Sequence, residues 1–160
     1  MVDKGRKQGM VRIEPQHPDH AEGLFAALCD PRIYAFLDDA PPQSIEAVRQ
    51  RIHRLIAGPP PERLETWLNW SVFLDETIVG YTQATLHNQT SATLAYVFSP
   101  IVWGNGTAEQ AVDLTIATLA GQHGVIKLTA DTDVRNLPSQ GLLGRLRFVQ
   151  THQHGCDIFY

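Results

Sequence analysis

Two glycines separated by one residue stand between an apolar segment and a predicted helix, in the sequence Trp103-Gly104-Asn105-Gly106-Thr107. Glycine lets a backbone approach a ligand closely, and the first N–H groups of a helix have no partner within the helix. Those free donors and the helix dipole favour a bound anion, and phosphate suits them best. The spacing therefore predicts a phosphate-binding turn, although the same glycines could serve only a tight strand-to-helix connection.

Two common nucleotide-binding patterns fit this turn poorly. A dinucleotide-binding fingerprint needs G-x-G-x-x-G, and Glu109 stands where the third glycine would be. A P-loop needs lysine and then serine or threonine after its last glycine, whereas Thr107 and Ala108 follow Gly106. The turn must therefore be judged together with the elements that surround it.

The predicted elements form a sheet that would hold this turn in place. Alternating apolar residues predict strands at 11–16, 67–74, 78–86 and 92–98, the last three forming a meander. Further strands are expected at 125–130, 148–151 and 158–160. Helical periodicity predicts one helix starting near residue 18, a second after Ser44, a third over 107–120 and a fourth from Asn136 to Leu146.

Local signals predict where these helices begin and end. Asp19, followed three residues later by Glu22, is typical of a capping box, and Ser44 is a plausible cap for the second helix. Gly58 and the three prolines after it end that second helix, because proline cannot continue it. The third helix is expected to run to about Ala120 and to be ended by Gly121 and Gly124.

This order of elements indicates the α+β class, in a three-layer α/β arrangement with a mixed, largely antiparallel central sheet. We expect roughly six or seven strands flanked by about four helices, with a right-handed β-α-β crossover at the glycine turn. The length of 160 residues and the 43% hydrophobic content fit one domain, placed at 10–160. Residues 1–9 are expected to be a disordered tail.

Composition argues against several kinds of partner. A net charge of −4 makes nucleic-acid binding an unfavourable interpretation. No apolar run reaches the roughly 18 residues of a membrane span, and the N-terminus lacks the apolar part of a secretory signal. We therefore expect a cytoplasmic protein, monomeric or homodimeric. Cys29 lies on the apolar side of the first predicted helix and is expected to be a buried, reduced thiol.

Residues 95–111, AYVFSPIVWGNGTAEQA, resemble the acetyl-CoA motif of the GNAT superfamily of N-acetyltransferases. The closest pattern is that of the branch with the ribosomal-protein N-terminal acetyltransferases, G-Y-x-x-x-P-x-x-W-G-x-G-x-A-x-E-A. A second resemblance follows, because Asn136 and Ser139, then Leu146-Arg147-Phe148, are similar to N-x-x-S and L-G-F. The order of predicted elements also matches that fold over nearly the whole chain.

The resemblance implies transfer of an acetyl group from acetyl-CoA to a primary amine by direct attack, through a tetrahedral intermediate. It implies that the glycine turn binds the pyrophosphate and that the preceding strand, usually bulged, pairs with the pantetheine arm and then parts from its neighbour. It implies no metal. The residues that the resemblance assigns to coenzyme A are Val97, Phe98, Ser99, Val102, Trp103, Gly104, Asn105, Gly106, Thr107, Ala108, Asn136 and Ser139.

Three residues depart from the family pattern. Ala95 replaces a common glycine before the tyrosine, and Arg147 replaces the glycine of L-G-F. Thr93 stands where many members carry a glutamate that acts as general base. The last change favours an alternative function, a degenerate, non-catalytic acyl-CoA-binding or regulatory module of the same fold. A plain interaction domain with this fold is a third, weaker hypothesis.

An amine must lose a proton before it attacks, so another base is needed. The candidates are His87, Asp131 and Asp133, each of which could instead be an ordinary turn residue, and a water chain would also serve. For protonating the leaving thiolate, Ser139 is the first candidate and Tyr96 the second. The resemblance implies that one backbone N–H near Phe98 stabilises the oxyanion.

The amine end of the site is less well marked. The acceptor pocket is expected between residues 33–42 and the C-terminal hairpin, where Asp38 and Asp39 could attract an ammonium group, although ordinary loop carboxylates would look the same. A small molecule and a protein N-terminus both remain possible acceptors. His152 and His154 stand two residues apart without a suitable third ligand, so no metal site is predicted.

Overall fold

Four antiparallel strands and one parallel strand form the central sheet, in the order β1-β2-β3-β4-β5. The computed structural model describes residues 9–160, so the predicted tail at 1–9 lies outside the described residues except for Gly9. The antiparallel strands are β1 (Val11–Pro15), β2 (Thr66–Leu74), β3 (Thr77–Leu86) and β4 (Ser91–Phe98). β5 (Lys127–Thr129) lies parallel to β4 after a crossover through α3 (Thr107–His123), which confirms the predicted β-α-β unit.

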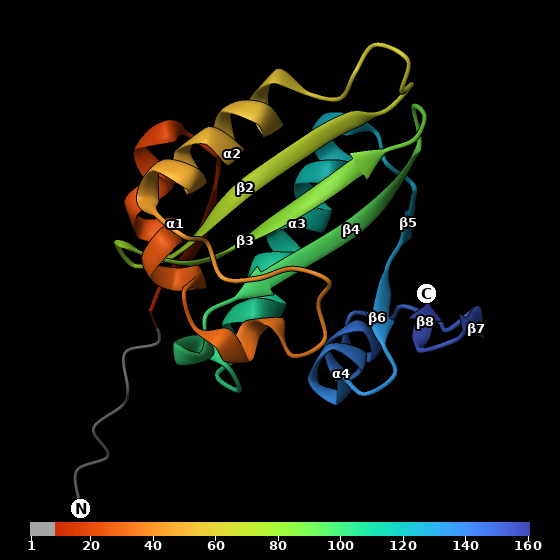
Figure 1. Cartoon of the computed structure of the whole chain (residues 1–160). Helices are drawn as coiled ribbons and strands as arrows, with labels where there is room; N and C mark the ends of the chain where they lie inside the picture. Colours follow the sequence, from red (N-terminus) through yellow and green to blue (C-terminus); the bar gives the residue numbers. More distant parts are fainter. Residues whose placement is uncertain (1–8) are drawn as a thin grey trace, which may run out of the picture.

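A second, three-stranded sheet has the order β6-β8-β7. Its strands are β6 (Asp131–Asp133), β7 (His152–His154) and β8 (Asp157–Phe159). Ala130, between β5 and β6, exchanges backbone hydrogen bonds of 3.1 and 2.8 Å with Tyr160. The segment 127–133 therefore pairs with β4 by its first part and with β8 by its second part, and Figure 1 shows β8 on the side away from β4.

This division corrects two details of the predicted sheet. A single sheet of six or seven strands was expected, but the strands separate into sheets of five and three. No strand forms at 148–151; the first strand of the C-terminal hairpin is instead β7, within the residues expected to make its turn. Pairing with β8 determines which residues form β7. Short polar segments have no alternating apolar pattern, so the sequence does not predict such pairing.

The helices cover the two faces of the central sheet. α1 (Ala21–Leu28) and α2 (Ile45–Ala57) lie on one face and α3 on the other, while α4 (Leu137–Arg145) lies beside the second sheet (Figure 1). On the first face, apolar residues of α1 and α2 pack against Tyr81 of β3. On the second face, Thr82 Oγ1 and Thr115 Oγ1 form a fully buried hydrogen bond of 2.7 Å that joins β3 to α3.

Some predicted helix ends are confirmed and others are wrong. Ser44 Oγ accepts a hydrogen bond of 3.0 Å from Ala47 N–H, so the predicted cap of α2 is present. Asp19 caps nothing; His17 Nδ1 accepts from Asp19 N–H instead, and a 3₁₀ turn precedes α1. α3 continues past Gly121 to His123, because Gly121 adopts ordinary helical geometry there.

Cys29 also differs from its prediction. Both cysteines are free, but the Cys29 side chain is exposed because α1 ends one residue earlier, at Leu28. A residue past the end of a helix does not follow the helical period, so its place in the sequence pattern does not predict whether its side chain is buried.

Arg147 occupies a backbone conformation that favours glycine. Its φ is 66°, in the left-handed region, and it follows α4 directly. Its N–H donates to the Gly144 carbonyl at 3.0 Å, and Phe148 N–H donates to the Leu143 carbonyl at 2.9 Å. This is the usual way to close a helix, and glycine is the preferred residue there. The structure thus gives the physical reason for the glycine in the L-G-F pattern that Arg147 replaces.

We expect Arg147→Gly to raise the free energy of unfolding by about 1 kcal/mol, because glycine relieves the left-handed strain at some entropic cost. Arg147 is exposed, so no packing is lost. Urea unfolding followed by circular dichroism measures the change. Gly124→Ala, at the left-handed residue that closes α3, is the reciprocal control and should lose a similar amount. A destabilised Arg147→Gly variant would contradict the assignment.

Candidate functional site

β4 and β5 pair over only three positions and then part. The pairs are Ser91 with Lys127, Ala92 with Leu128 and Thr93 with Thr129. Beyond Thr93, β4 continues to Phe98 alongside β3 alone, in a regular register; the bulge expected in β4 lies instead between β2 and β3. We call the point after Thr93 and Thr129 the fork. The predicted parting of the two strands is therefore present.

The backbone of β4 beyond the fork presents an open edge. Ser99 N–H donates to the Val79 carbonyl at 2.8 Å, so Ser99 faces β3. Because antiparallel pairing alternates along a strand, Val97 also directs its backbone groups to β3, whereas Leu94, Tyr96 and Phe98 direct theirs away. Leu94 still pairs with β5 through its N–H, because the last parallel pair joins Thr93 to Thr129. We call the outward groups of Tyr96 and Phe98 the open edge.

Of the three residues that the resemblance assigned to the pantetheine arm, this alternation places one on the open edge and two toward β3. Phe98 lies on the open edge; its carbonyl accepts a hydrogen bond of 3.0 Å from Trp103 Nε1, and its N–H faces the gap. Val97 and Ser99 use their N–H groups toward β3 and have none to offer there. Sequence reasoning did not place Tyr96 on this edge, because the phase of the alternation depends on pairing with β3.

The glycine turn at the end of the open edge offers free donors. Gly104 and Gly106 have φ of 75° and 84°, and a Cβ at either would meet no atom within 4 Å. The N–H groups of Gly104, Asn105, Gly106 and Ala108 make no hydrogen bond to any residue of the described chain. Thr107 N–H is taken by Asn105 Oδ1 at 3.0 Å. The turn thus combines open space with unpaired donors, as a pyrophosphate requires.

Val102 and Trp103 have structural contacts in this turn. Their N–H groups donate to the carbonyls of Ser99 and Pro100, both at 3.1 Å, and Val102 is buried. The Trp103 ring lies 5.8 Å from the Arg32 guanidinium, on the segment between α1 and α2. The Trp103 indole also donates to the Phe98 carbonyl, so these contacts hold the corner between β4 and α3.

A chain of hydrogen bonds lies at the fork. His87 Nε2 is 2.7 Å from Thr93 Oγ1, which is 3.0 Å from Thr129 Oγ1. Asp131 lies two residues beyond Thr129 and on the same face, and a groove of about 850 Å³ runs past these residues. Burial, and to a smaller extent the Asp157 carboxylate, raises the pKa of Asp131. Of the residues predicted as bases, His87 therefore bonds Thr93 at the fork, and Asp131 lines the groove with Thr93 and Thr129. The Asp133 carboxylate is instead bound by Arg135 at 2.8 Å.

The opposite face of β4 carries a second polar pair. Tyr96 Oη lies 2.8 Å from Ser139 Oγ, and Ser139 N–H donates to Asn136 Oδ1 at 3.2 Å. Asn136 therefore caps α4. Burial raises the pKa of Tyr96, while the hydrogen bond from Ser139 opposes that rise. The two residues proposed separately as proton donors are in direct contact.

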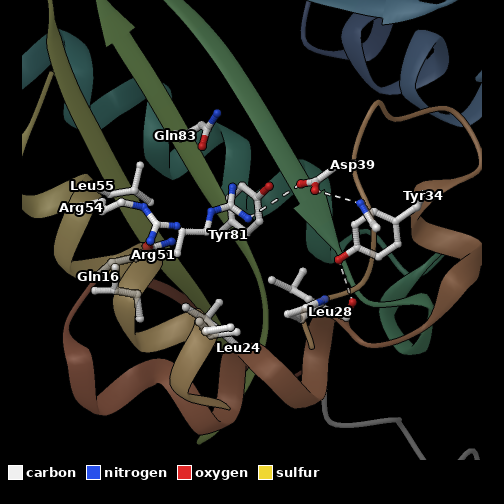
Figure 2. Close-up of a pocket in the computed structure, with 15 residues that line it drawn as sticks. Gln16, Leu24, Leu28, Tyr34, Asp39, Arg51, Arg54, Leu55, Tyr81 and Gln83 are labelled. Carbon is white, nitrogen blue, oxygen red and sulfur yellow. Dashed lines mark hydrogen bonds and ion pairs between the residues drawn. The ribbon is translucent and has the colours of Figure 1, made fainter. Parts of the chain in front are cut away.

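A cavity of about 170 Å³ lies on the α1 and α2 face of the central sheet (Figure 2). Tyr81 and Gln83 of β3 form part of it, and Asp39 and Arg51 line it from the two sides. Part of the segment 33–42, where one wall of the acceptor pocket was predicted, lines this cavity, and α2 lines another side of it. No residue of the C-terminal hairpin lines it. Tyr34 donates to the Leu28 carbonyl at 2.7 Å, and burial raises its pKa to about 12.

Neither a metal cluster nor a membrane-spanning helix occurs within residues 9–160. No three His, Cys, Asp or Glu side chains of this part of the chain come together as a metal site would need, and the His152 ring stacks on Phe159 at 4.5 Å. None of the helices in the same range combines the length and apolar character needed to cross a membrane.

Comparison with known proteins agrees with this geometry. The model of the "Acetyltransferase (GNAT) domain" family matches residues 11–149. Among curated protein sequences, none matches this chain.

Solved structures show the same fold at low identity. A GNAT-family acetyltransferase from Bacillus anthracis is 15% identical over 96% of this chain and 95% of its own, with a TM-score of 0.76. An acetyltransferase from Thermus thermophilus is 22% identical over 94% and 95%, with a TM-score of 0.75. A ribosomal-protein-S5-alanine acetyltransferase from Vibrio fischeri is 16% identical over 93% and 90%, also at 0.75.

Gly106→Val should weaken acetyl-CoA binding at least about tenfold, because the side chain fills the space over the free N–H groups. Calorimetry measures the binding. Gly155→Val is the matched control, since Gly155 also has positive φ and open space but lies in the β7–β8 turn. Both changes should cost about 1–2 kcal/mol of stability, so equal binding by the two variants would contradict the site.

Asp131→Asn should stabilise the protein near neutral pH. A raised pKa means that the folded state disfavours the carboxylate, so the amide removes a cost that is present above the folded pKa. The gain should vanish at about pH 3, where both folded and unfolded states hold the proton. Urea midpoints across this range measure it.

Asp133→Asn is the control with the opposite sign. Arg135 lowers the pKa of Asp133 to about 2, so its carboxylate stabilises the fold at neutral pH, and this stability is lost as pH falls through the folded pKa. Losses of stability at neutral pH in both variants would show that Asp131 lacks the proposed environment.

Proposed function

Because the chain belongs to the GNAT acetyltransferase family, we propose that its domain at 10–160 transfers the acetyl group of acetyl-CoA to a primary amine. The observation that carries this proposal is the open edge of β4, which leads from the fork to a turn with four free N–H groups. A strand edge and an anion site in this order suit a molecule with an amide-bearing arm and a pyrophosphate.

We assign the cofactor to residues along this path. The pyrophosphate binds the N–H groups of Gly104, Asn105, Gly106 and Ala108. The pantetheine amides pair with the open edge as an added strand would. Asn136 and Ser139 border the thiol end, because Ser139 touches Tyr96 of the same edge.

Phe98 N–H is the proposed oxyanion donor. Its own carbonyl is bonded to the Trp103 indole, which fixes the local backbone, and the N–H on the same side of the strand has room for an acceptor. A donor held in place before the reaction stabilises developing negative charge without reorganising.

The amine must give up a proton on the α1 and α2 face of the fork. Asp131 can accept it directly, since a carboxyl with a raised pKa is a better base than an ordinary one. His87 can accept it through the Thr93 hydroxyl, which donates to the imidazole as it takes the proton from the amine. Thr93 would thus join the proton path at the position where relatives carry glutamate.

The leaving thiolate needs a proton on the other face of β4. Ser139 can supply one and be resupplied by Tyr96, whose hydroxyl lies 2.8 Å away. The raised pKa of Tyr96 keeps that reserve proton in place at neutral pH. Acid and base therefore act from opposite faces of one strand, which keeps the two proton transfers apart.

The test is calorimetry with acetyl-CoA, followed by measurement of free thiol released over a panel of amines. We expect binding, amine-dependent thiol release, and a Ser139→Ala variant that lowers kcat by about tenfold or more with little change in cofactor Kd. Absence of binding at high cofactor concentration would exclude the proposal. Binding without turnover on any amine would favour the non-catalytic module suggested by Thr93.

A further inference from the structure

Arg51 of α2 differs from most other arginines of the described chain in making no hydrogen bond there. Arg32, Arg49 and Arg135 each bond a nearby carboxylate, at 2.7, 2.6 and 2.8 Å. Arg51 lies 4.0 Å from Asp39, too far for a hydrogen bond. Its donors therefore remain free although a carboxylate is close.

Two contacts nevertheless hold the Arg51 guanidinium over the cavity. It lies 5.5 Å from the centre of the Tyr81 ring, within the range of a cation–π interaction. Asp39 attracts it from the opposite side, and Figure 2 shows Arg51, Tyr81 and Asp39 facing one another in the cavity. A guanidinium that is oriented but not bonded is prepared for a planar anion, and a carboxylate matches its paired donors.

The charge and size of the cavity further limit the kinds of ligand that it can bind. Arg54 also lines it, so two arginines face one carboxylate, and the excess charge is positive. Leu24, Leu28 and Ile52 supply an apolar side. A volume of about 170 Å³ suits a small molecule. A polyamine would meet like charge here, whereas a small amine that carries a carboxylate would not.

The cavity also lies within reach of the reacting centre. Tyr81 and Gln83 are paired with Val97 and Ala95 of β4, so they stand one strand, about 4.8 Å, from the strand that carries the open edge. A ligand whose carboxylate binds Arg51 can therefore extend its amine across β3 toward β4.

We propose that the acceptor is a small primary amine bearing a carboxylate, such as an amino acid, and that Arg51 binds that carboxylate. The proposal rests on the proposed function in taking this ligand as the acetyl acceptor. Arg51 sets specificity, and the apolar side of the cavity sets the size of the acceptor.

Direct binding tests this independently of turnover. Calorimetry on the coenzyme A complex compares L-alanine, β-alanine and γ-aminobutyrate, each with its own carboxamide, and includes putrescine. Further arms use a tripeptide beginning with aspartate and the same peptide beginning with asparagine. The variants are Arg51→Gln, Arg51→Lys and, as a control on another side of α2, Arg49→Gln, whose partner Glu46 is exposed.

At least one free acid should bind about tenfold or more tightly than its amide, as a charge-assisted hydrogen bond predicts. Arg51→Gln should abolish that preference, Arg51→Lys should keep part of it, and Arg49→Gln should keep all of it. Equal binding of acids and amides, a preference that survives Arg51→Gln, or preference for putrescine would overturn the proposal. Preference confined to the acidic tripeptide would overturn the small-molecule source.

Failure of acetyl transfer has a different signature. If no amine releases thiol but the Arg51-dependent preference is present, the proposed function fails and the carboxylate site stands. If thiol is released equally from acids and their amides, the function stands and the carboxylate site fails.

Discussion

Beyond Leu94, no strand of the described chain pairs with the outer edge of β4, and the rest of the site depends on this gap. The gap exists because the segment 127–133 pairs with β4 for only three residues and then turns its other edge to β8. Buried backbone groups normally find partners, so an unpaired edge within a fold has to be supported by its surroundings. Here the Trp103 indole bonds the Phe98 carbonyl, and α4 brings Ser139 against Tyr96.

Successive side chains of β4 point to opposite faces of the sheet, and this places two groups of polar side chains on different faces. Thr93 points to the α1 and α2 face, where it joins His87 and Thr129, whereas Tyr96 points to the other face and joins Ser139. No loop is needed to separate Thr93 from Tyr96, because odd-numbered and even-numbered residues of one strand lie on opposite faces. The cavity with Arg51 lies on the first face, on the same side of the sheet as the Thr93 hydroxyl.

Much of the fold could be predicted because long apolar patterns specify it. The meander, the cap at Ser44 and the crossover through α3 all follow from local periodicity and end signals. The C-terminal strands could not, since short polar segments such as 152–154 become strands only through pairing with β8. The prediction that Cys29 is buried was wrong because α1 ends one residue before it, and sequence patterns do not locate a helix end that closely.

The candidate site divides in the same way. Backbone features, such as the glycine turn and its free donors, follow from residue type and spacing. Side-chain partnerships do not, because they join residues brought together only by the fold: Tyr96 with Ser139, His87 with Thr93, and Arg51 with Tyr81. The cavity beside Arg51 could not be located from the sequence for that reason, since one of its walls comes from α2.

The open edge of β4 also affects how readily the protein aggregates at high concentration. Unpaired strand edges are templates for foreign strands and a common origin of aggregation. A ligand that occupies such an edge covers it, and by mass action it also stabilises the fold that binds it. Under the proposed function, in which coenzyme A occupies this edge, the supply of coenzyme A and the resistance of this protein to self-association are physically linked.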